Sequence, residues 1–160
     1  MTVRPFEEIV AEHGSVVMRV CRALLVPADA EEAWSETFLS AMQAYPRLRR
    51  DSNVRAWLVT IAHNKAIDQI RSAERRPRPT ADLPERSVHD DPSTEADGDL
   101  RSAVGSLPPK QRAAVVYRYL ADLSYGEIAV QLECSEAAAR RNAADGIATL
   151  RQHYLKGTLP

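Results

Sequence analysis

Hydrophobic positions recur along this chain at helical spacing, and no long stretch alternates with a period of two residues. Between residues 6 and 25, apolar side chains return mostly every three or four positions, as one face of an α-helix requires. β-Branched residues do not gather into strand-like runs. The pattern therefore predicts an all-α protein.

Two more helices are predicted in the first half of the chain. Asp29 can N-cap the second helix, with Glu32 three residues on as its capping-box partner, and Pro46 prevents its continuation. After a basic loop at residues 47–53, a third helix is expected over about 54–74. The side chains of this helix expected to face the core are Leu58, Ala62, Ala66 and Ile70.

Residues 75–99 interrupt the helical pattern. This stretch is rich in proline and acidic residues and holds only two large aliphatic side chains. It cannot bury enough apolar surface to offset the entropy of ordering it, which predicts a flexible linker. The linker divides the chain into two small helical domains, residues 1–74 and 100–160.

The second domain carries the local signals of a helix-turn-helix. Pro108 and Pro109 suit the start of a helix. Residues 124–127 form a capping box that opens a short helix through Leu132, and Ser135 caps a final helix to about residue 154. The second helix of such a motif lies in the DNA major groove. The final helix is expected to pack on the core through Ala139, Ala143, Ile147, Leu150 and Tyr154.

The net charge of −1 conceals an alternation of sign along the chain. Residues 47–79 hold nine Lys/Arg against three Asp/Glu, and residues 100–160 hold eight against five. Residues 80–99, in contrast, hold one Arg against seven acidic residues. This distribution indicates two surfaces that face a polyanion, separated by an acidic connector.

Several classes of protein are excluded by what the sequence lacks. No apolar run approaches the length of a membrane span, and the acidic N-terminal region does not resemble a signal peptide. Cys21 and Cys134 match no metal or redox spacing and are expected to be free thiols in the cytoplasm. Without a nucleophile–base pair, a metal-ligand cluster or a phosphate-binding glycine loop, we expect no enzymatic activity, metal or cofactor.

Four stretches resemble one known family. The sequences LPPKQR at residues 107–112 and LSYGEIA at 123–129 resemble the C-terminal domain of extracytoplasmic-function (ECF) sigma factors. The sequences DAEEAWSETFL at 29–39 and RAWLVTIAHNKAID at 55–68 resemble the family's polymerase-binding and promoter-melting helices. The resemblance implies a factor that binds the clamp and flap of core RNA polymerase and holds it on promoter DNA. It also implies an anti-sigma protein as a possible partner.

The resemblance assigns three groups of candidate site residues. For the group on the 54–74 helix, the spacing of the residues supports the assignment independently. One face of the 54–74 helix combines an aromatic ring with Asn and Arg side chains, which suits the stacking and backbone contacts of a single strand. The −10 group is Arg49, Arg50, Ser52, Asn53, Arg55, Trp57, Thr60, Asn64, Lys65, Arg71 and Arg75. The −35 group is Ser124, Tyr125, Ser135, Ala137, Ala138, Arg140, Arg141 and Asn142. The polymerase-binding group is Asp29, Glu31, Glu32, Trp34, Glu36 and Phe38.

Alternatives remain open for the chain and for single residues. The second hypothesis for the whole chain is a stand-alone helix-turn-helix regulator that never touches polymerase. Trp34 and Trp57 each suit either the core or an interface, and His63 is expected at the surface. The acidic linker is expected to mimic nucleic acid on the way to the RNA exit path.

The helix-turn-helix departs from the family pattern at two points. Glu133 stands in the turn where the family carries glycine, and the left-handed conformation costs a non-glycine residue about 1–2 kcal/mol, so we expect a rebuilt turn. Arg141 and Asp145 have the spacing of an ion pair that would compete with phosphate. We therefore predict weak DNA binding by this domain alone.

Overall fold

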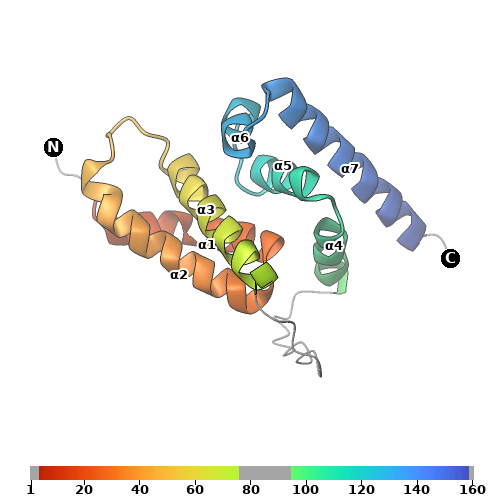
Figure 1. The fold of residues 1–160 in the computed structure, drawn as a ribbon, viewed down its shortest axis with the longest axis horizontal. Helices are drawn as coiled ribbons and strands as arrows, with labels where there is room; N and C mark the ends of the chain where they lie inside the picture. Colours follow the sequence, from red (N-terminus) through yellow and green to blue (C-terminus); the bar gives the residue numbers. More distant parts are fainter. Residues whose placement is uncertain (1–3, 76–94, 159–160) are drawn as a thin grey trace.

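The computed structural model describes residues 4–75 and 95–158, and within these ranges every regular element is helical, as predicted. Helices α1 to α3 form one group and α4 to α7 form a second group beside it (Figure 1). Residues 76–94, most of the expected linker, lie outside the described residues.

The first group contains α1 (Phe6–Leu24), α2 (Pro27–Ala44), the short 3-10 helix η1 (Tyr45–Arg47) and α3 (Val54–Arg75). The prediction that Asp29 caps α2 is wrong. Val26 occupies the N-cap position without a side-chain cap, and Pro27 opens the helix because its fixed φ is already helical. Asp29 lies in the first turn, where a carboxylate still interacts favourably with the helix dipole.

Aromatic rings fill the space between α1 and α2. Trp34 and Phe38 lie 4.7 Å apart between ring centroids, and Phe6 packs against both Phe38 and Tyr45. The indole Nε1 of Trp34 donates a hydrogen bond of 2.8 Å to the carbonyl oxygen of Gly14. Trp34 is half-buried and packs against the core of the first group.

Helix α3 packs its predicted apolar face only in part. Leu58, Ala62 and Ala66 are buried, but Ile70 is 41% exposed, so its placement in the core is wrong. Helix α1 ends at Leu24, and Ile70 lines the open surface beside this helix end rather than a packed interior.

The second group contains α4 (Glu95–Gly105), α5 (Pro109–Tyr119), α6 (Tyr125–Leu132) and α7 (Glu136–Thr158). Helix α4 begins five residues inside the stretch expected to be linker, and α3 includes Arg75 at its other end. The segment between α3 and α4 is therefore shorter at both ends than the predicted linker, because the proline content marks the middle of the stretch and not its edges.

Helix α7 packs closely on α5 through small residues. Ala139, Ala143 and Gly146 are buried along this contact, whereas Ile147 is half-buried. A Cβ atom at Gly146 would lie 2.6 Å from Cγ2 of Val115, so only glycine allows this approach of the two helices.

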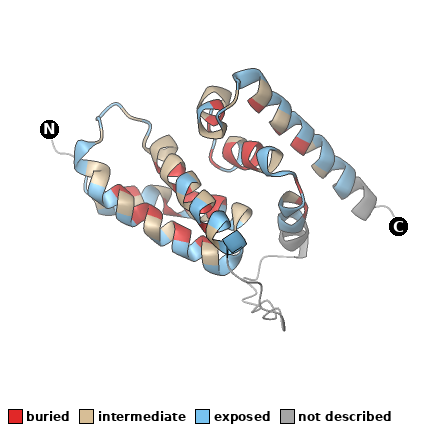
Figure 2. Ribbon diagram, in the orientation of Figure 1, coloured by how far each residue is buried: buried red, intermediate tan, exposed pale blue. Residues whose placement is uncertain are grey.

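The two groups share one of the two hydrophobic clusters of the described residues. Val20 of α1 and Val59 of α3 are fully buried, and both belong to the cluster that contains Tyr117 of α5. Buried positions accordingly occur on the facing sides of both groups (Figure 2). The two groups thus pack as one body in this structure.

Candidate nucleic-acid and polymerase interface

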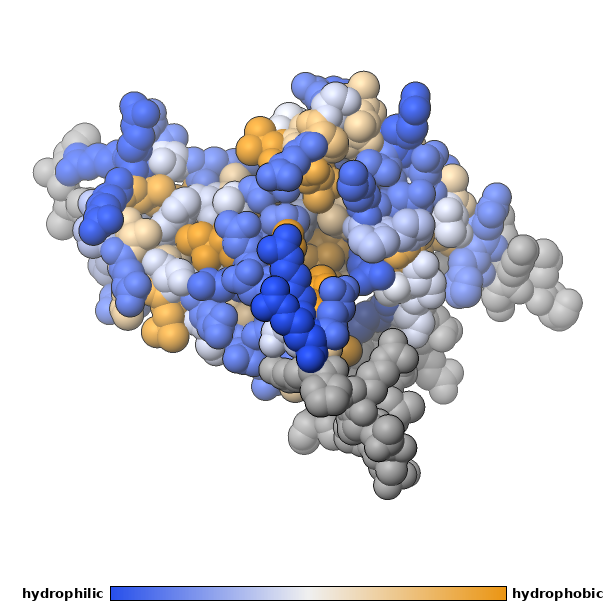
Figure 3. Space-filling view, in the orientation of Figure 1, coloured by the Kyte–Doolittle hydropathy of each residue, from blue (hydrophilic) through white to orange (hydrophobic). Residues whose placement is uncertain are grey.

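The basic loop between α2 and α3 is open to solvent. Arg47, Arg49 and Arg50 are exposed, and hydrophilic side chains gather over this end of the molecule (Figure 3). Asn53, a candidate for lining a base pocket, caps α3: its Oδ1 accepts a hydrogen bond of 3.2 Å from the Ala56 amide. Its side-chain NH2 group is the part that could contact a base.

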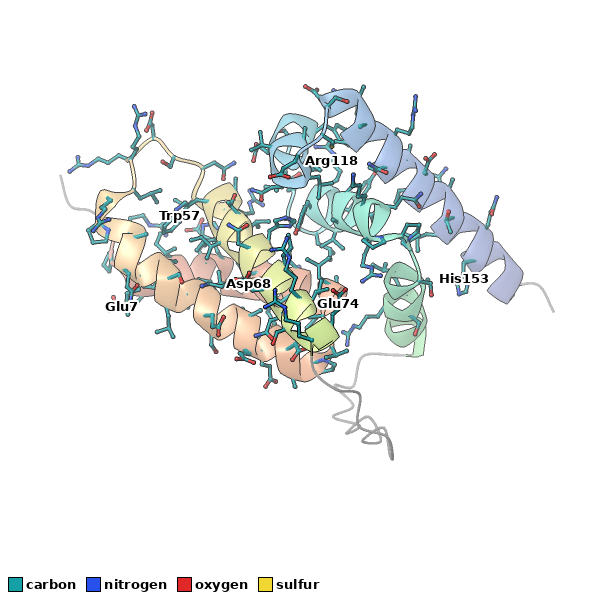
Figure 4. All side chains as sticks on the ribbon, in the orientation of Figure 1. Glu7, Trp57, Asp68, Glu74, Arg118 and His153 are labelled. Carbon is teal, nitrogen blue, oxygen red and sulfur yellow. The ribbon has the colours of Figure 1, made fainter. Side chains whose placement is uncertain are left out.

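The polar face of α3 begins at this loop and runs the length of the helix. Trp57 lies at the loop end, half-buried against Tyr45 at 6.5 Å between ring centroids (Figure 4). Further along, Asn64, Asp68 and Arg71 are exposed. The helix thus presents an aromatic edge, an amide and a guanidinium in sequence, a set that can stack on bases and contact a phosphate backbone.

Two half-buried polar residues of α3 are hydrogen-bonded to the second group of helices. The Gln131 side-chain amide of α6 donates a hydrogen bond to the Thr60 hydroxyl. A second hydrogen bond joins Nδ1 of His63 and the hydroxyl of Tyr117 on α5. The expectation that His63 lies at the surface is wrong, because the ring is half-buried between the groups, where burial lowers its pKa.

The turn of the helix-turn-helix keeps its conformation without glycine. Ser124 accepts a hydrogen bond of 3.1 Å from the Glu127 amide at the start of α6, and Ser135 accepts one of 3.0 Å from the Ala138 amide at the start of α7. Both caps are confirmed. Glu133 adopts φ 53° and ψ 48°, the left-handed region, so the expectation of a rebuilt turn is wrong. The two caps and the adjoining helices hold Glu133 in this costly conformation.

Tyr125, at the start of α6, lies between two arginine side chains. The guanidinium carbons of Arg118 and Arg140 each lie 4.7 Å from the centre of its ring, which is cation–π geometry. Arg118 also donates to the Leu123 carbonyl at 3.0 Å. Arg118 could not be predicted from the sequence, because it comes from α5 and no local spacing connects it to Tyr125.

The ion pair of the recognition helix differs from the expected one. Nη2 of Arg140 lies 2.8 Å from Oε1 of Glu136, four residues earlier. In the described part of the chain no ion pair joins Arg141 to Asp145, and Arg141 is exposed. Glu136, and not Asp145, is therefore the acidic group that pairs with an arginine of this helix.

Helix α2 presents a mixed acidic and apolar surface. Glu31 and Glu32 are exposed, and so are Leu39 and Met42, at 57% and 52%. Phe38 is only 6% exposed, so its assignment to a contact surface is wrong: its ring completes the aromatic core. Leu39 and Met42 were not among the predicted contact residues, although the sequence shows them as an apolar pair on the acidic side of this helix.

Neither metal chemistry nor membrane insertion is indicated by the described residues. No group of three or more His, Cys, Asp or Glu side chains among them could hold a metal ion. No helix among them is long and apolar enough to cross a membrane.

Comparison with known proteins identifies the two groups of helices. Sigma-70 region 2 matches residues 9–76, and Sigma-70 region 4 matches residues 97–150. Among solved structures, the sigma factor RpoE of Bartonella quintana, in complex with the anti-sigma factor NepR, shares the fold with a TM-score of 0.76 at 19% identity. The match covers 98% of this chain and all of that one. CnrH in complex with the cytosolic domain of CnrY has a TM-score of 0.70 at 23% identity, covering 96% and 89%. This arrangement of domains is that of a sigma-70-type transcription factor.

Relatives of similar sequence identify the family within this class. The chain is 30% identical to the ECF sigma factor SigC of Mycobacterium tuberculosis over 145 residues, covering 88% of this chain and 78% of the relative. It is 31% identical to SigL of the same species, covering 88% and 83%, and 30% identical to CarQ of Myxococcus xanthus, covering 92% and 87%. The chain belongs to the ECF family of RNA polymerase sigma factors. It is therefore not a stand-alone helix-turn-helix regulator.

Proposed function

We propose that the exposed polar face of α3, together with the basic loop before it, binds the unpaired −10 strand of the promoter. The observation that carries this assignment is the placement of Asn64 and Arg71 on one exposed face, in line with Trp57, which lies at the helix end that adjoins the loop with its three exposed arginines. An amide can hydrogen-bond base edges, and a guanidinium can contact the backbone. We assign Ser52 and the Asn53 NH2 group to the lining of a pocket for an extruded base.

We assign the −35 duplex to the helix-turn-helix and core polymerase to α2. The first turns of α7 carry exposed Ala137, Arg140 and Arg141, the part of a recognition helix that reaches base edges and phosphates. On α2, Glu31 and Glu32 suit a basic polymerase surface, and Leu39 and Met42 supply apolar contact beside them. Polymerase performs the chemistry, and this chain supplies promoter choice and strand capture.

The neighbours RpoE and CnrH were solved with the partners NepR and CnrY. We propose that this chain also has an inhibitory protein partner. Val130 of α6 is 77% exposed and Ile70 of α3 is 41% exposed, and both line the groove between the two groups. Apolar side chains at such a groove suit a partner helix.

Run-off transcription with purified core polymerase on a promoter library, read by sequencing, tests the assignment of α3. Replacing Asn64 and Arg71 by Ala should lower promoter-dependent transcription about tenfold or more, because charge-assisted hydrogen bonds to the strand are lost. Arg151→Ala/Gln152→Ala, two exposed residues at the far end of α7, is the matched control and should leave transcription unchanged. Equal activity of both variants would contradict the assignment.

A further inference from the structure

The two arginines in the first turns of α7 differ in what surrounds them. Nη2 of Arg140 lies 2.8 Å from Oε1 of Glu136, and the two side chains are 61% and 56% exposed. Among the described residues Arg141 forms no ion pair, and it is exposed. An exposed ion pair is weak and screened by salt, so a competing charge can replace one partner.

The guanidinium of Arg140 is held from a second side by an aromatic ring. Its central carbon lies 4.7 Å from the ring centre of Tyr125, and so does that of Arg118, which comes from α5 (Figure 4). Arg118 is itself fixed by its hydrogen bond of 3.0 Å to the Leu123 carbonyl. The direction of the Arg140 side chain is therefore set by the protein before any DNA is present.

The carboxylate of Glu136 lies where the starts of α6 and α7 meet. Its Oε2 is 4.0 Å from the position that a Cβ atom would take at Gly126, the second residue of α6. In a helix-turn-helix the first helix crosses the DNA backbone while the second enters the major groove. A carboxylate between the two helix starts carries the charge sign of a phosphate, and an arginine binds both groups through the same fork of N–H donors.

We propose that Glu136 is a positioning residue that occupies the phosphate position beside Arg140, so that Arg140 contacts the DNA backbone only after this ion pair breaks. The inference rests on the proposed function of the helix-turn-helix on duplex DNA. An arginine that exchanges a carboxylate for a phosphate adds no net neutralisation of the DNA, so it releases no additional counterion. Removing the charge of Glu136 therefore strengthens duplex binding without adding a donor.

The test uses the full chain and a labelled pool of random-sequence duplex DNA, with binding followed by fluorescence anisotropy over a series of salt concentrations. Glu136→Gln keeps the length of the side chain and removes its charge. Asp122→Asn is the charge-matched control, since it neutralises another exposed carboxylate of the second group and asparagine tolerates the local φ of 55°. Circular dichroism confirms that each variant is folded.

Glu136→Gln should bind the pool about two- to fivefold more tightly. The plot of log affinity against log salt should steepen by about 0.9, the value of one additional phosphate contact. The control should leave this slope unchanged. In an Arg140→Gln background, Glu136→Gln should gain no more than the control, because no guanidinium is released. An unchanged slope, or a full gain that persists without Arg140, overturns the proposal.

Sequencing of the bound DNA separates a phosphate contact from base reading. A phosphate contact carries no sequence information, so Glu136→Gln should raise binding of all sequences alike. Enrichment of particular bases would assign Glu136 to base reading and overturn the proposal. Failure of the proposed function is distinguishable through Arg141→Ala, which would then leave duplex affinity unchanged. If Arg141→Ala weakens binding and Glu136→Gln changes nothing, only the role of Glu136 is wrong.

Discussion

The two nucleic-acid elements of this chain are built in different ways. In the helix-turn-helix, Ser124 and Ser135 each cap their helix within three residues, and the turn at Glu133 is held by its immediate neighbours. The face of α3 depends on distant residues: its start is supported by Tyr45, and Thr60 and His63 are engaged by the second group. The caps and the turn of the helix-turn-helix are therefore encoded locally, whereas the exposure of the α3 face is set by tertiary contacts.

The shared core gives the strongest test of this comparison. Leu58 of α3 lies in the core of the first group and Ile128 of α6 lies in the cluster that both groups share. Both are fully buried, so truncating either to Ala should lower the free energy of unfolding by about 2–5 kcal/mol. Because the shared cluster joins the two groups, both variants should shift the same single transition in chemical denaturation, followed by circular dichroism and tryptophan fluorescence. The exposed change Ala148→Ser serves as control. Two separated transitions would show that the groups fold independently.

This contrast explains how much of the molecule the sequence could predict. The caps at Ser124 and Ser135 follow from local spacing, and the structure contains both. The Arg118–Tyr125–Arg140 arrangement and the burial of His63 depend on which helices meet in space. Periodicity reports which side of a helix is apolar, but not which neighbour covers it.

The same limit applies to the proposed polymerase and DNA surfaces, where the sequence does not show which side chains are covered by neighbours. The resemblance selected α2 and α3 as elements, but it could not separate exposed from buried members. Phe38 proved to be core, and Leu39 and Met42 proved to be exposed. The apolar pattern assigned Ile70 to the interior, although α1 ends too early to cover it. Element identity was therefore predictable, and side-chain exposure was not.

A smaller effect is expected when the caps of the helix-turn-helix are removed. Ser124→Ala and Ser135→Ala should each lower the free energy of unfolding by about 1 kcal/mol, because each leaves a helix-terminal amide without its partner. Thermal and urea denaturation measure the loss. Ser106→Ala is the control, since its hydroxyl donates to the Ser102 carbonyl and caps no helix amide. A loss no larger than that of the control would contradict the view of a locally encoded motif.

Relieving the strain at the turn should raise the free energy of unfolding by a still smaller amount. Glu133→Gly should raise the free energy of unfolding by about 0.5–1 kcal/mol, because the relief of left-handed strain exceeds the added entropy of the unfolded chain. Asp122 has a similar φ of 55° and provides the comparison. Asp tolerates this conformation better than Glu, so Asp122→Gly should gain less. A gain from Asp122→Gly that equals or exceeds that of Glu133→Gly would argue against strain at Glu133.

The smallest effect is expected from the titration of His63, and it tests the interface between the two groups. Burial lowers the pKa of His63 in the closed structure, and Glu133 opposes this shift only partly. The other charged groups that line the same groove are Asp68, Arg71, Lys110 and Arg112. Because the neutral ring is favoured in the folded state, its contribution is fully present above the unfolded pKa of about 6.5. It is lost as the pH falls below that value, since the unfolded chain then binds a proton that the folded chain does not.

The free energy of unfolding should therefore decrease between pH 7.5 and pH 5.5, and His63→Phe should make this decrease shallower. Phenylalanine keeps the edge-on ring contact with Tyr117, which lies at 5.4 Å between centroids, but cannot titrate. His13, whose pKa is also lowered by burial, retains its own contribution in the variant, so part of the slope should remain. His153→Phe, the same replacement at an exposed position of α7, is the matched control. Equal slopes for the unmodified chain and His63→Phe would show that His63 binds protons equally in the folded and unfolded states, which would contradict its burial between the two groups.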